Sequence, residues 1–141
     1  MTPRFAEFFQ NHPQLILGFL ALAGGLIWTL LAGRSPGVVR VNPNDATRLI
    51  NSEDAVVLDV RADAEYRNGH IINAINVPRA QLDTQLDSLD KYKSRPIITV
   101  CRNGQDSARV GVTLKQKGFD QVHTLTGGLQ TWETANLPLA K

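Results

Sequence analysis

An uncharged apolar segment near the N-terminus divides the chain into two parts. No aspartate, glutamate, lysine or arginine occurs between Glu7 and Arg34. Within that gap, the eighteen residues Leu15–Ala32 carry only two polar side chains, those of Trp28 and Thr29. A helix of this length spans about 27 Å, close to the hydrocarbon thickness of a bilayer. Because the segment is apolar on every face, it suits a membrane better than a half-exposed position on a soluble domain, and the sequence predicts one transmembrane helix.

A cleaved export signal is the main alternative to an uncleaved anchor. The apolar region of such a signal is usually about 7–15 residues long and follows a basic leader. Here the leader, residues 1–14, carries the acidic Glu7 as well as Arg4. Leu30 also stands where a small residue would be expected before cleavage after Ala32. These features favour an uncleaved, single-pass anchor.

The residues around the apolar segment also predict its orientation and one kind of partner. The C-terminal flank is the more basic of the two, with Arg34, Arg40 and Arg48. This bias predicts an inner or plasma membrane protein whose C-terminal part lies in the cytoplasm. Ala21 and Gly25 have the spacing of small residues at close helix–helix contacts, which suggests a membrane-protein partner.

After a short tether, Gly33–Gly37, the chain continues as a predicted soluble domain, Val38–Lys141, long enough to bury one core. Over the whole chain, 15 lysines and arginines stand against 13 aspartates and glutamates, a balance that argues against a nucleic-acid partner. The single cysteine rules out a disulfide framework and a thiolate-rich metal site. Because the three histidines show no metal-ligand spacing either, we expect neither a metal nor another cofactor.

Short β-rich runs alternate with helical patterns throughout this domain. The predicted strands are Val38–Val41, Ala55–Val60, Ala74–Val77, Pro96–Val100 and Gln121–Leu125. The predicted helices are Pro43–Asn51 with Asn42 as its N-cap, a turn at Ala64–Asn68, a segment with Leu82, Leu86 and Leu89 on one face, Ser107–Lys117 and Leu129–Ala135. This alternation predicts an α/β fold in which five buried strands form a mostly parallel sheet with helices on both faces.

Chemistry in such a fold is expected where the carboxyl end of a strand meets the N-terminus of a helix. Cys101 directly follows the predicted strand Pro96–Val100, and a short loop leads from it to the helix beginning at Ser107. Backbone N–H groups and the positive end of the helix dipole make such a loop an anion site and favour a nucleophilic thiolate. Gly104 gives the loop its backbone freedom, and Arg102 and Arg109 add positive charge. The simpler alternative is that Cys101 is a small apolar side chain in the core.

At these residues the chain resembles the rhodanese-like family of sulfurtransferases. The loop Cys101–Ser107 fits the family pattern Cys-x-x-Gly-x-x-Ser/Ala. Three further stretches resemble other family signatures in order and spacing, and these are Leu58–Arg61 with Glu65–Ile71, Ala74–Pro78, and Gly127–Trp132. The resemblance covers Val38–Pro138 and implies a rhodanese-like domain with thiosulfate-type sulfurtransferase activity.

The resemblance further implies that Cys101 takes sulfane sulfur from a small donor or a persulfidated protein and passes it to a thiol acceptor. The persulfide would be held by the loop residues Arg102, Asn103, Gly104, Gln105, Asp106 and Ser107. Asp59 and Arg61, at the end of a predicted strand, would lie close to this loop, and we expect them to form an internal ion pair. We expect Glu65 and His70 to fix a turn, and Trp132 to anchor the last helix in the core.

Two departures from the family pattern bear on function. Many members have a basic residue before the loop-closing Ser, where this chain has Asp106, so an anionic donor is disfavoured and thiosulfate turnover is expected to be slow. Asn73 replaces a usual Gly in a turn, which Asn tolerates. A cysteine phosphatase would need an Arg at the position of Ser107. The remaining alternative is a non-catalytic or sulfur-carrier module that docks a partner at a membrane complex.

Overall fold

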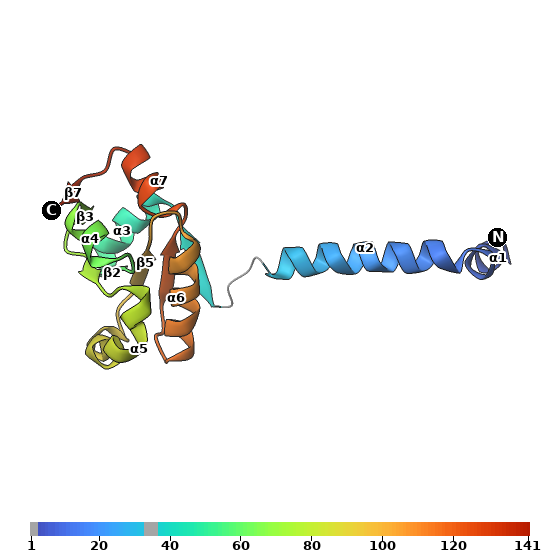
Figure 1. Ribbon diagram of the computed structural model, residues 1–141, viewed down its shortest axis with the longest axis horizontal. Helices are drawn as coiled ribbons and strands as arrows, with labels where there is room; N and C mark the ends of the chain where they lie inside the picture. Colours follow the sequence, from blue (N-terminus) through green and yellow to red (C-terminus); the bar gives the residue numbers. More distant parts are fainter. Residues whose placement is uncertain (1–2, 33–36) are drawn as a thin grey trace. The chain divides into compact units, whose positions relative to one another are not determined.

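The computed structural model describes residues 3–32 and 37–141 (Figure 1). The chain forms two compact units, Met1–Arg34 and Ser35–Lys141. The predicted tether Gly33–Gly37 lies outside the described residues except for Gly37.

The N-terminal unit consists of two helices, α1 (Pro3–Asn11) and α2 (Pro13–Ala32). The 19 residues Pro13–Leu31 have a mean hydropathy of 2.0, and none of them is buried. The hydroxyl of Thr29 donates to the backbone oxygen of Leu26 at 2.8 Å, so this polar side chain is satisfied within the helix. Helix α2 is therefore long and apolar enough to cross a membrane, and a signal sequence would share these properties.

The C-terminal unit contains a five-stranded, entirely parallel sheet in the order β1-β6-β5-β2-β4. Its strands are β1 (Val38–Val41), β2 (Val56–Asp59), β4 (Ile75–Asn76), β5 (Ile97–Val100) and β6 (Val122–Leu125). The predicted α/β fold and its parallel sheet are confirmed. A second, antiparallel pair of two-residue strands, β3 (His70–Ile71) and β7 (Leu139–Ala140), was not expected from the sequence.

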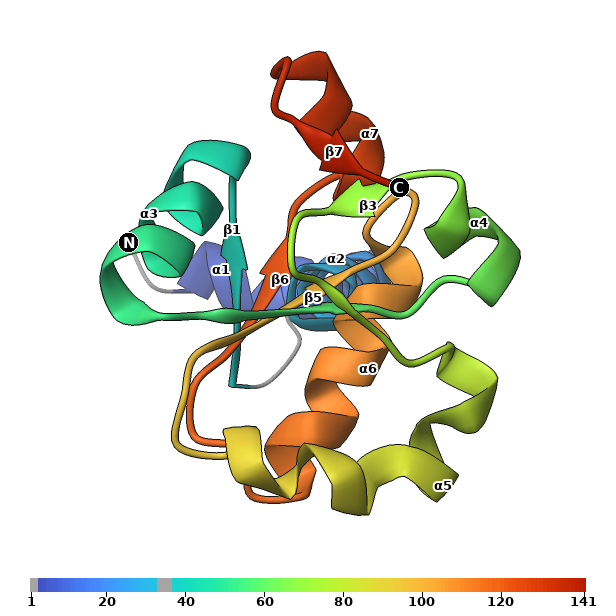
Figure 2. The same cartoon turned by 90° about the vertical axis from the view of Figure 1, so that its left-hand side faces the viewer.

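Helices cover both faces of the sheet, as predicted (Figure 1, Figure 2). They are α3 (Pro43–Glu53), α4 (Asp63–Arg67), α5 (Leu82–Gln85), α6 (Gln105–Gln116) and α7 (Gly128–Thr134), with the 3-10 segments η1 (Arg79–Gln81) and η2 (Leu86–Tyr92). On one face the buried side chains of α6 and of the segment after Leu82 meet the sheet. On the other face the sheet meets α3 and α7, where Trp132 is buried and its Nε1 donates to the backbone oxygen of Pro138.

The prediction of five buried strands holds only in part for the two edge strands, in which Val41, Ala74 and Val77 of the predicted runs are buried. Every residue of β2 and β5 is buried, which matches their unbroken apolar runs. In β1, by contrast, Val39 is 56% exposed, and neither residue of β4 is buried. Both strands lie at an edge of the sheet, where only one neighbouring strand covers them.

Two helix predictions are modified by local hydrogen bonds. Helix α3 begins as predicted, because the Asn42 side chain accepts the Asp45 N–H at 2.8 Å, but it ends at Glu53 rather than Asn51. The segment with Leu82, Leu86 and Leu89 on one face is a short helix followed by 3-10 turns. There the hydroxyls of Thr84 and Ser88 donate to backbone oxygens three residues earlier. Such local bonds compete with a continuous α-helix.

Candidate active site around Cys101

The thiol of Cys101 lies at the carboxyl end of β5, immediately before the turn that leads into α6. The residue is 4% exposed. The backbone N–H of Gly104 donates to Sγ at 3.0 Å, and Oγ of Ser107 lies 3.3 Å from the same sulfur. Two groups that can donate a hydrogen bond to a thiolate thus face the sulfur at the N-terminus of a helix, and the Asn103 side-chain oxygen lies 3.8 Å from it.

The hydroxyl of Ser107 is held in place by the two strands next to it. Ser107 is fully buried, and its Oγ accepts from the hydroxyl of Thr124 on β6 at 3.0 Å. The hydroxyl of Thr99 on β5 donates to the Ser107 backbone oxygen at 2.8 Å. Because Thr124 already donates to Ser107 Oγ, the hydrogen of Ser107 is free to point toward the sulfur of Cys101.

The turn between Cys101 and α6 is closed by Asn103 and Gly104. The Asn103 side-chain oxygen accepts the N–H of Gln105 at 3.1 Å, which starts α6 at Gln105 rather than at Ser107 as predicted. Gly104 has φ +94°, and a Cβ there would lie 3.1 Å from the backbone nitrogen of Gly127. Both the conformation and the close approach of a second backbone require glycine at this position.

Gly127 and Gly128 bring the N-terminus of α7 against the back of the same turn. The N–H of Leu129 donates to the Cys101 backbone oxygen at 2.8 Å, and that of Gln130 to the Arg102 oxygen at 3.2 Å. Gly128 has φ +62°, and a Cβ there would lie 2.4 Å from the Cys101 oxygen. The sequence reasoning did not assign these glycines a part in the site. The sequence feature that could have identified them is the pair of glycines directly before the predicted helix Leu129–Ala135.

A pocket of about 300 Å³ opens beside Cys101. Its lining consists of Val60, Arg61, Ala62, Glu65, Cys101, Arg102, Asn103 and Asp106. Of the other predicted loop residues, Gly104 and Ser107 contact the sulfur, whereas Gln105 contributes its N–H to the turn. Arg109 is not part of this lining. It borders a neighbouring pocket of about 190 Å³ together with Arg79.

Asp59 and Arg61 form the internal ion pair that the sequence suggested. Arg61 donates through Nε and Nη2 to both carboxylate oxygens of Asp59, with the shortest distance 2.7 Å, and the two side chains are 8% and 1% exposed. Arg61 Nη2 also donates to the Gly69 backbone oxygen at 2.7 Å. Asp59 does not line the pocket, and its effect there is to hold the Arg61 side chain in place.

Two exposed ion pairs at the rim join segments that are far apart in the sequence. Arg102 pairs with Glu65, and Arg79 Nη1 lies 2.7 Å from Asp106 Oδ1. The expectation that Glu65 fixes a turn with His70 is wrong, because Glu65 reaches across to Arg102. His70 does stabilise its turn, with Nδ1 2.8 Å from the Tyr66 backbone oxygen. Nothing in the sequence singled out Arg79.

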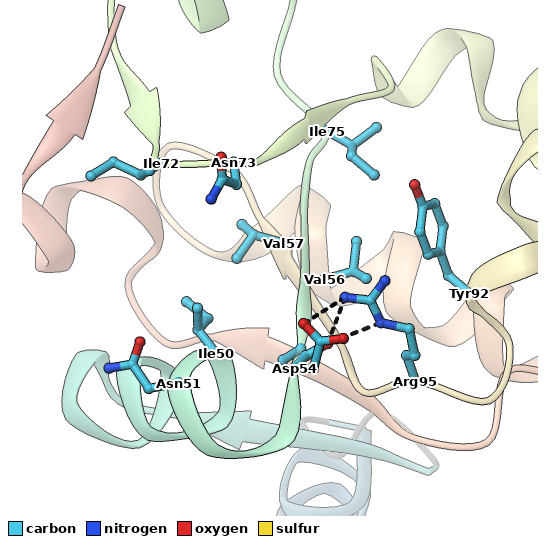
Figure 3. A pocket seen from close by; sticks show the side chains of 11 residues that line it. Ile50, Asn51, Asp54, Val56, Val57, Ile72, Asn73, Ile75, Tyr92 and Arg95 are labelled. Carbon is cyan, nitrogen blue, oxygen red and sulfur yellow. Dashed lines mark hydrogen bonds and ion pairs between the residues drawn. The ribbon is translucent and has the colours of Figure 1, made fainter.

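A second, larger pocket of about 550 Å³ lies at the other end of the strands (Figure 3). Its lining includes Val56 and Val57 at the start of β2, Ile72 and Tyr92. Arg95 and Asp54, which also line it, form an ion pair, and no cysteine or histidine is among its lining residues. Within residues 3–32 and 37–141, no cluster of three or more histidine, cysteine or acidic residues is arranged to hold a metal ion.

His123 is a partly buried residue on strand β6. Burial lowers the pKa of this imidazole from 6.5, and the nearby Glu53 carboxylate opposes that shift. Among the described residues, its buried Nδ1 has no hydrogen-bond partner. The side chain is thus a packed histidine, not part of the Cys101 pocket.

The domain is similar to proteins of a known family. Residues 42–135 match the rhodanese-like domain. The chain is 34% identical over 136 residues to the uncharacterized protein YibN of Escherichia coli K12, covering 96% of this chain and 95% of that protein. It is 35% identical over 89 residues to the thiosulfate sulfurtransferase GlpE of Coxiella burnetii, covering 63% of this chain and 81% of GlpE.

A solved structure leads to the same family. A rhodanese-related protein from Thermoplasma volcanium is 29% identical to this chain and superimposes with a TM-score of 0.65. The superposition covers 72% of this chain and 97% of that protein. The parallel sheet, the strand–turn–helix at Cys101 and these similarities agree, and the chain belongs to the rhodanese-like family of sulfurtransferases.

Proposed function

We propose that this protein is a membrane-anchored sulfurtransferase that carries sulfane sulfur on Cys101 as a persulfide. The observation that carries the proposal is the position of the Cys101 sulfur. It accepts the Gly104 N–H at 3.0 Å, at the N-terminus of α6, and borders an open pocket. A thiolate at such a place is both stabilised and accessible to a small donor.

The reaction proceeds in two balanced steps. The Cys101 thiolate attacks the outer sulfur of the donor, the sulfur–sulfur bond of the donor breaks, and the leaving group departs with the electron pair. With thiosulfate as donor, the products are the Cys101 persulfide and sulfite. An acceptor thiolate then attacks the outer sulfur of the persulfide, and Cys101 leaves as a thiolate.

The surroundings of Cys101 supply positioning and electrostatic stabilisation. The Gly104 N–H and the Ser107 hydroxyl face the reacting sulfur, and the contacts of α7 with the Cys101 and Arg102 oxygens keep the turn rigid. Donors fixed in advance do not have to reorganise as negative charge moves between sulfur atoms.

Helix α2 supports the membrane part of the proposal. Apart from the side chains of Gln14, Trp28 and Thr29 it is apolar over Pro13–Leu31. The match to YibN covers 96% of the chain, so it includes most of this helix. The basic bias after the helix favours a cytoplasmic domain. Intact-mass analysis of membrane-extracted protein tests the anchor, since retention of Met1 or Thr2 is expected and a mature start near Gly33 would contradict it.

The catalytic proposal predicts a specific mass change. The full-length chain in detergent micelles is incubated with thiosulfate or a persulfidated protein. After removal of excess donor, its intact mass is measured by mass spectrometry. A gain of one sulfur atom is expected, removed by cyanide or dithiothreitol. Cys101→Ser is expected to show no gain, while its circular dichroism spectrum matches that of the wild type.

The opposite outcome would support a different class of function. If neither donor adds sulfur to the wild type, Cys101 is not a sulfur carrier under these conditions. The domain would then be a docking module recruited to a membrane complex through α2.

A further inference from the structure

The charges that line the Cys101 pocket cancel one another. Two arginines, Arg61 and Arg102, and two carboxylates, Glu65 and Asp106, border the pocket. An anion-binding pocket normally presents an excess of positive charge. Here the lining itself offers none.

Three arginines at or beside the pocket are each engaged by a carboxylate. Arg61 is held by Asp59, Arg102 by Glu65, and a third arginine, Arg79 from η1, by Asp106. The Arg79–Asp106 distance is 2.7 Å, which is the geometry of a direct charge-assisted hydrogen bond. A carboxylate so close to a guanidinium cancels most of its potential at the distance of an incoming ligand.

Asp106 has a second effect on an anionic ligand. It lies in the first turn of α6, whose N-terminus faces the sulfur. The positive end of the helix dipole attracts anions, and a carboxylate in the first turn already interacts with it. Asp106 thus opposes an anionic donor by cancelling the positive charge of Arg79 and by interacting with the positive end of the helix dipole.

We propose that the Arg79–Asp106 ion pair determines donor specificity, so that the protein prefers a hydropersulfide, R–S–SH, to the doubly charged thiosulfate. This inference rests on the proposed function. The Cys101 thiolate attacks the terminal sulfur of R–S–SH, the S–S bond breaks, and R–S⁻ leaves with the electron pair. The products are the Cys101 hydropersulfide and a thiolate. The total charge is one negative unit throughout, and no oxidant or reductant is required.

The ion pair can be opened without a large cost to the fold. The Arg79 and Asp106 side chains are 49% and 53% exposed. Exposed pairs of this kind contribute little to stability. Asp106→Asn removes the carboxylate charge and leaves Arg79 free to bind an anion.

The test compares two donors and two variants of equal net charge. Full-length protein in detergent micelles is mixed with thiosulfate or with the hydropersulfide of N-acetylcysteine amide, and the rate constant of persulfide formation is measured by quenched intact-mass analysis. Asp106→Asn is expected to raise the thiosulfate rate constant by about fivefold to tenfold, and the persulfide rate constant by less than about twofold. Added salt should shrink the thiosulfate gain.

Asp90→Asn is the matched control, because Asp90 is 56% exposed and pairs with Lys93 at 3.1 Å outside the linings of both the Cys101 and Arg79 pockets. Its thiosulfate rate constant is expected to equal that of the wild type. A gain in Asp106→Asn no larger than in Asp90→Asn would overturn the inference while leaving the proposed function intact. If no variant forms a persulfide from either donor, the proposed function falls, and the inference falls with it.

Discussion

The pocket beside Cys101 and the larger pocket beside Tyr92 lie at opposite ends of the parallel strands. Cys101 follows the last residue of β5, whereas Val56 and Val57 on the wall of the larger pocket begin β2. The helix termini at the two pockets also have opposite polarity. The N-terminus of α6 faces the sulfur of Cys101, but Asp54, which caps the C-terminus of α3, borders the larger pocket.

This difference explains why the smaller pocket is the better candidate site. Backbone N–H groups and the positive end of a helix dipole favour a thiolate, whereas the exposed carbonyls at a helix C-terminus do not. In open α/β sheets, ligands collect at the carboxyl ends of the strands. Strand direction and helix polarity, more than pocket volume, therefore make the Cys101 pocket the stronger candidate site.

The largest expected effect comes from a substitution at Gly128, whose backbone packs against the Cys101 turn. Gly128→Ala places a Cβ 2.4 Å from the Cys101 oxygen at φ +62°. We expect the turn to shift and the rate of persulfide formation to fall by about a hundredfold or more, because small displacements of reacting groups carry large rate penalties. The measurement is the rate of sulfur addition by intact mass.

Gly118→Ala is the control for backbone strain alone. Gly118 also has a positive φ, +95°, but no atom lies within 4 Å of its added Cβ. We expect it to destabilise the domain by about 1–2 kcal/mol and to leave persulfide formation within about twofold. If both variants lose activity equally, backbone strain accounts for the loss, and the contact between Gly128 and the Cys101 turn does not.

Asp59 and Asp54, each paired with an arginine, should differ in their contribution to stability. Asp59→Asn leaves the buried charge of Arg61 without its carboxylate, and we expect a loss of about 3–5 kcal/mol. Asp54→Asn removes only the carboxylate charge beside Arg95, which keeps its hydrogen bonds to the Asp54 backbone oxygen. Because the Asp54 side chain is 87% exposed, we expect a loss of less than about 1 kcal/mol. Urea unfolding followed by fluorescence measures the free energy of unfolding of both variants. Equal losses would contradict the distinction between a buried and an exposed ion pair.

The local part of this site was predictable from the sequence. The β-branched run of β5 and the glycine-containing loop after it placed Cys101 at the end of a strand, and the Asn42–Pro43 pair predicted the start of α3. These features depend on residues that are neighbours in the sequence. Backbone conformation and capping over a few residues are sufficient to specify them.

The charge pattern at the pocket was not predictable in the same way. Arg79 and Asp106 are 27 residues apart, and Glu65 and Arg102 are 37 residues apart. Their pairing depends on how the loops after neighbouring parallel strands meet at one edge of the sheet. The sequence alone suggested that Asp106 places a negative charge near the pocket, whereas the structure pairs this carboxylate with Arg79.

The smallest expected effect concerns His123, on the α3 face of the sheet and away from Cys101. Burial lowers the pKa of its imidazole in the folded state below the unfolded value of 6.5. Well above pH 6.5 the ring is neutral in both states and has no effect on the pH dependence of stability. As the pH falls below 6.5, the unfolded chain binds the proton first, so the free energy of unfolding decreases until the folded ring is also protonated.

His123→Leu should therefore flatten the pH dependence of stability below pH 6.5. No hydrogen bond of Nδ1 is lost, because this buried nitrogen has no partner among the described residues. Urea unfolding of wild type and variant at a series of pH values from neutral downward isolates this histidine, since all other titrating groups are common to both proteins. An unchanged slope would mean that the ring is solvated in the folded state. Persulfide formation at neutral pH should remain that of the wild type, because His123 is not among the residues that line the Cys101 pocket.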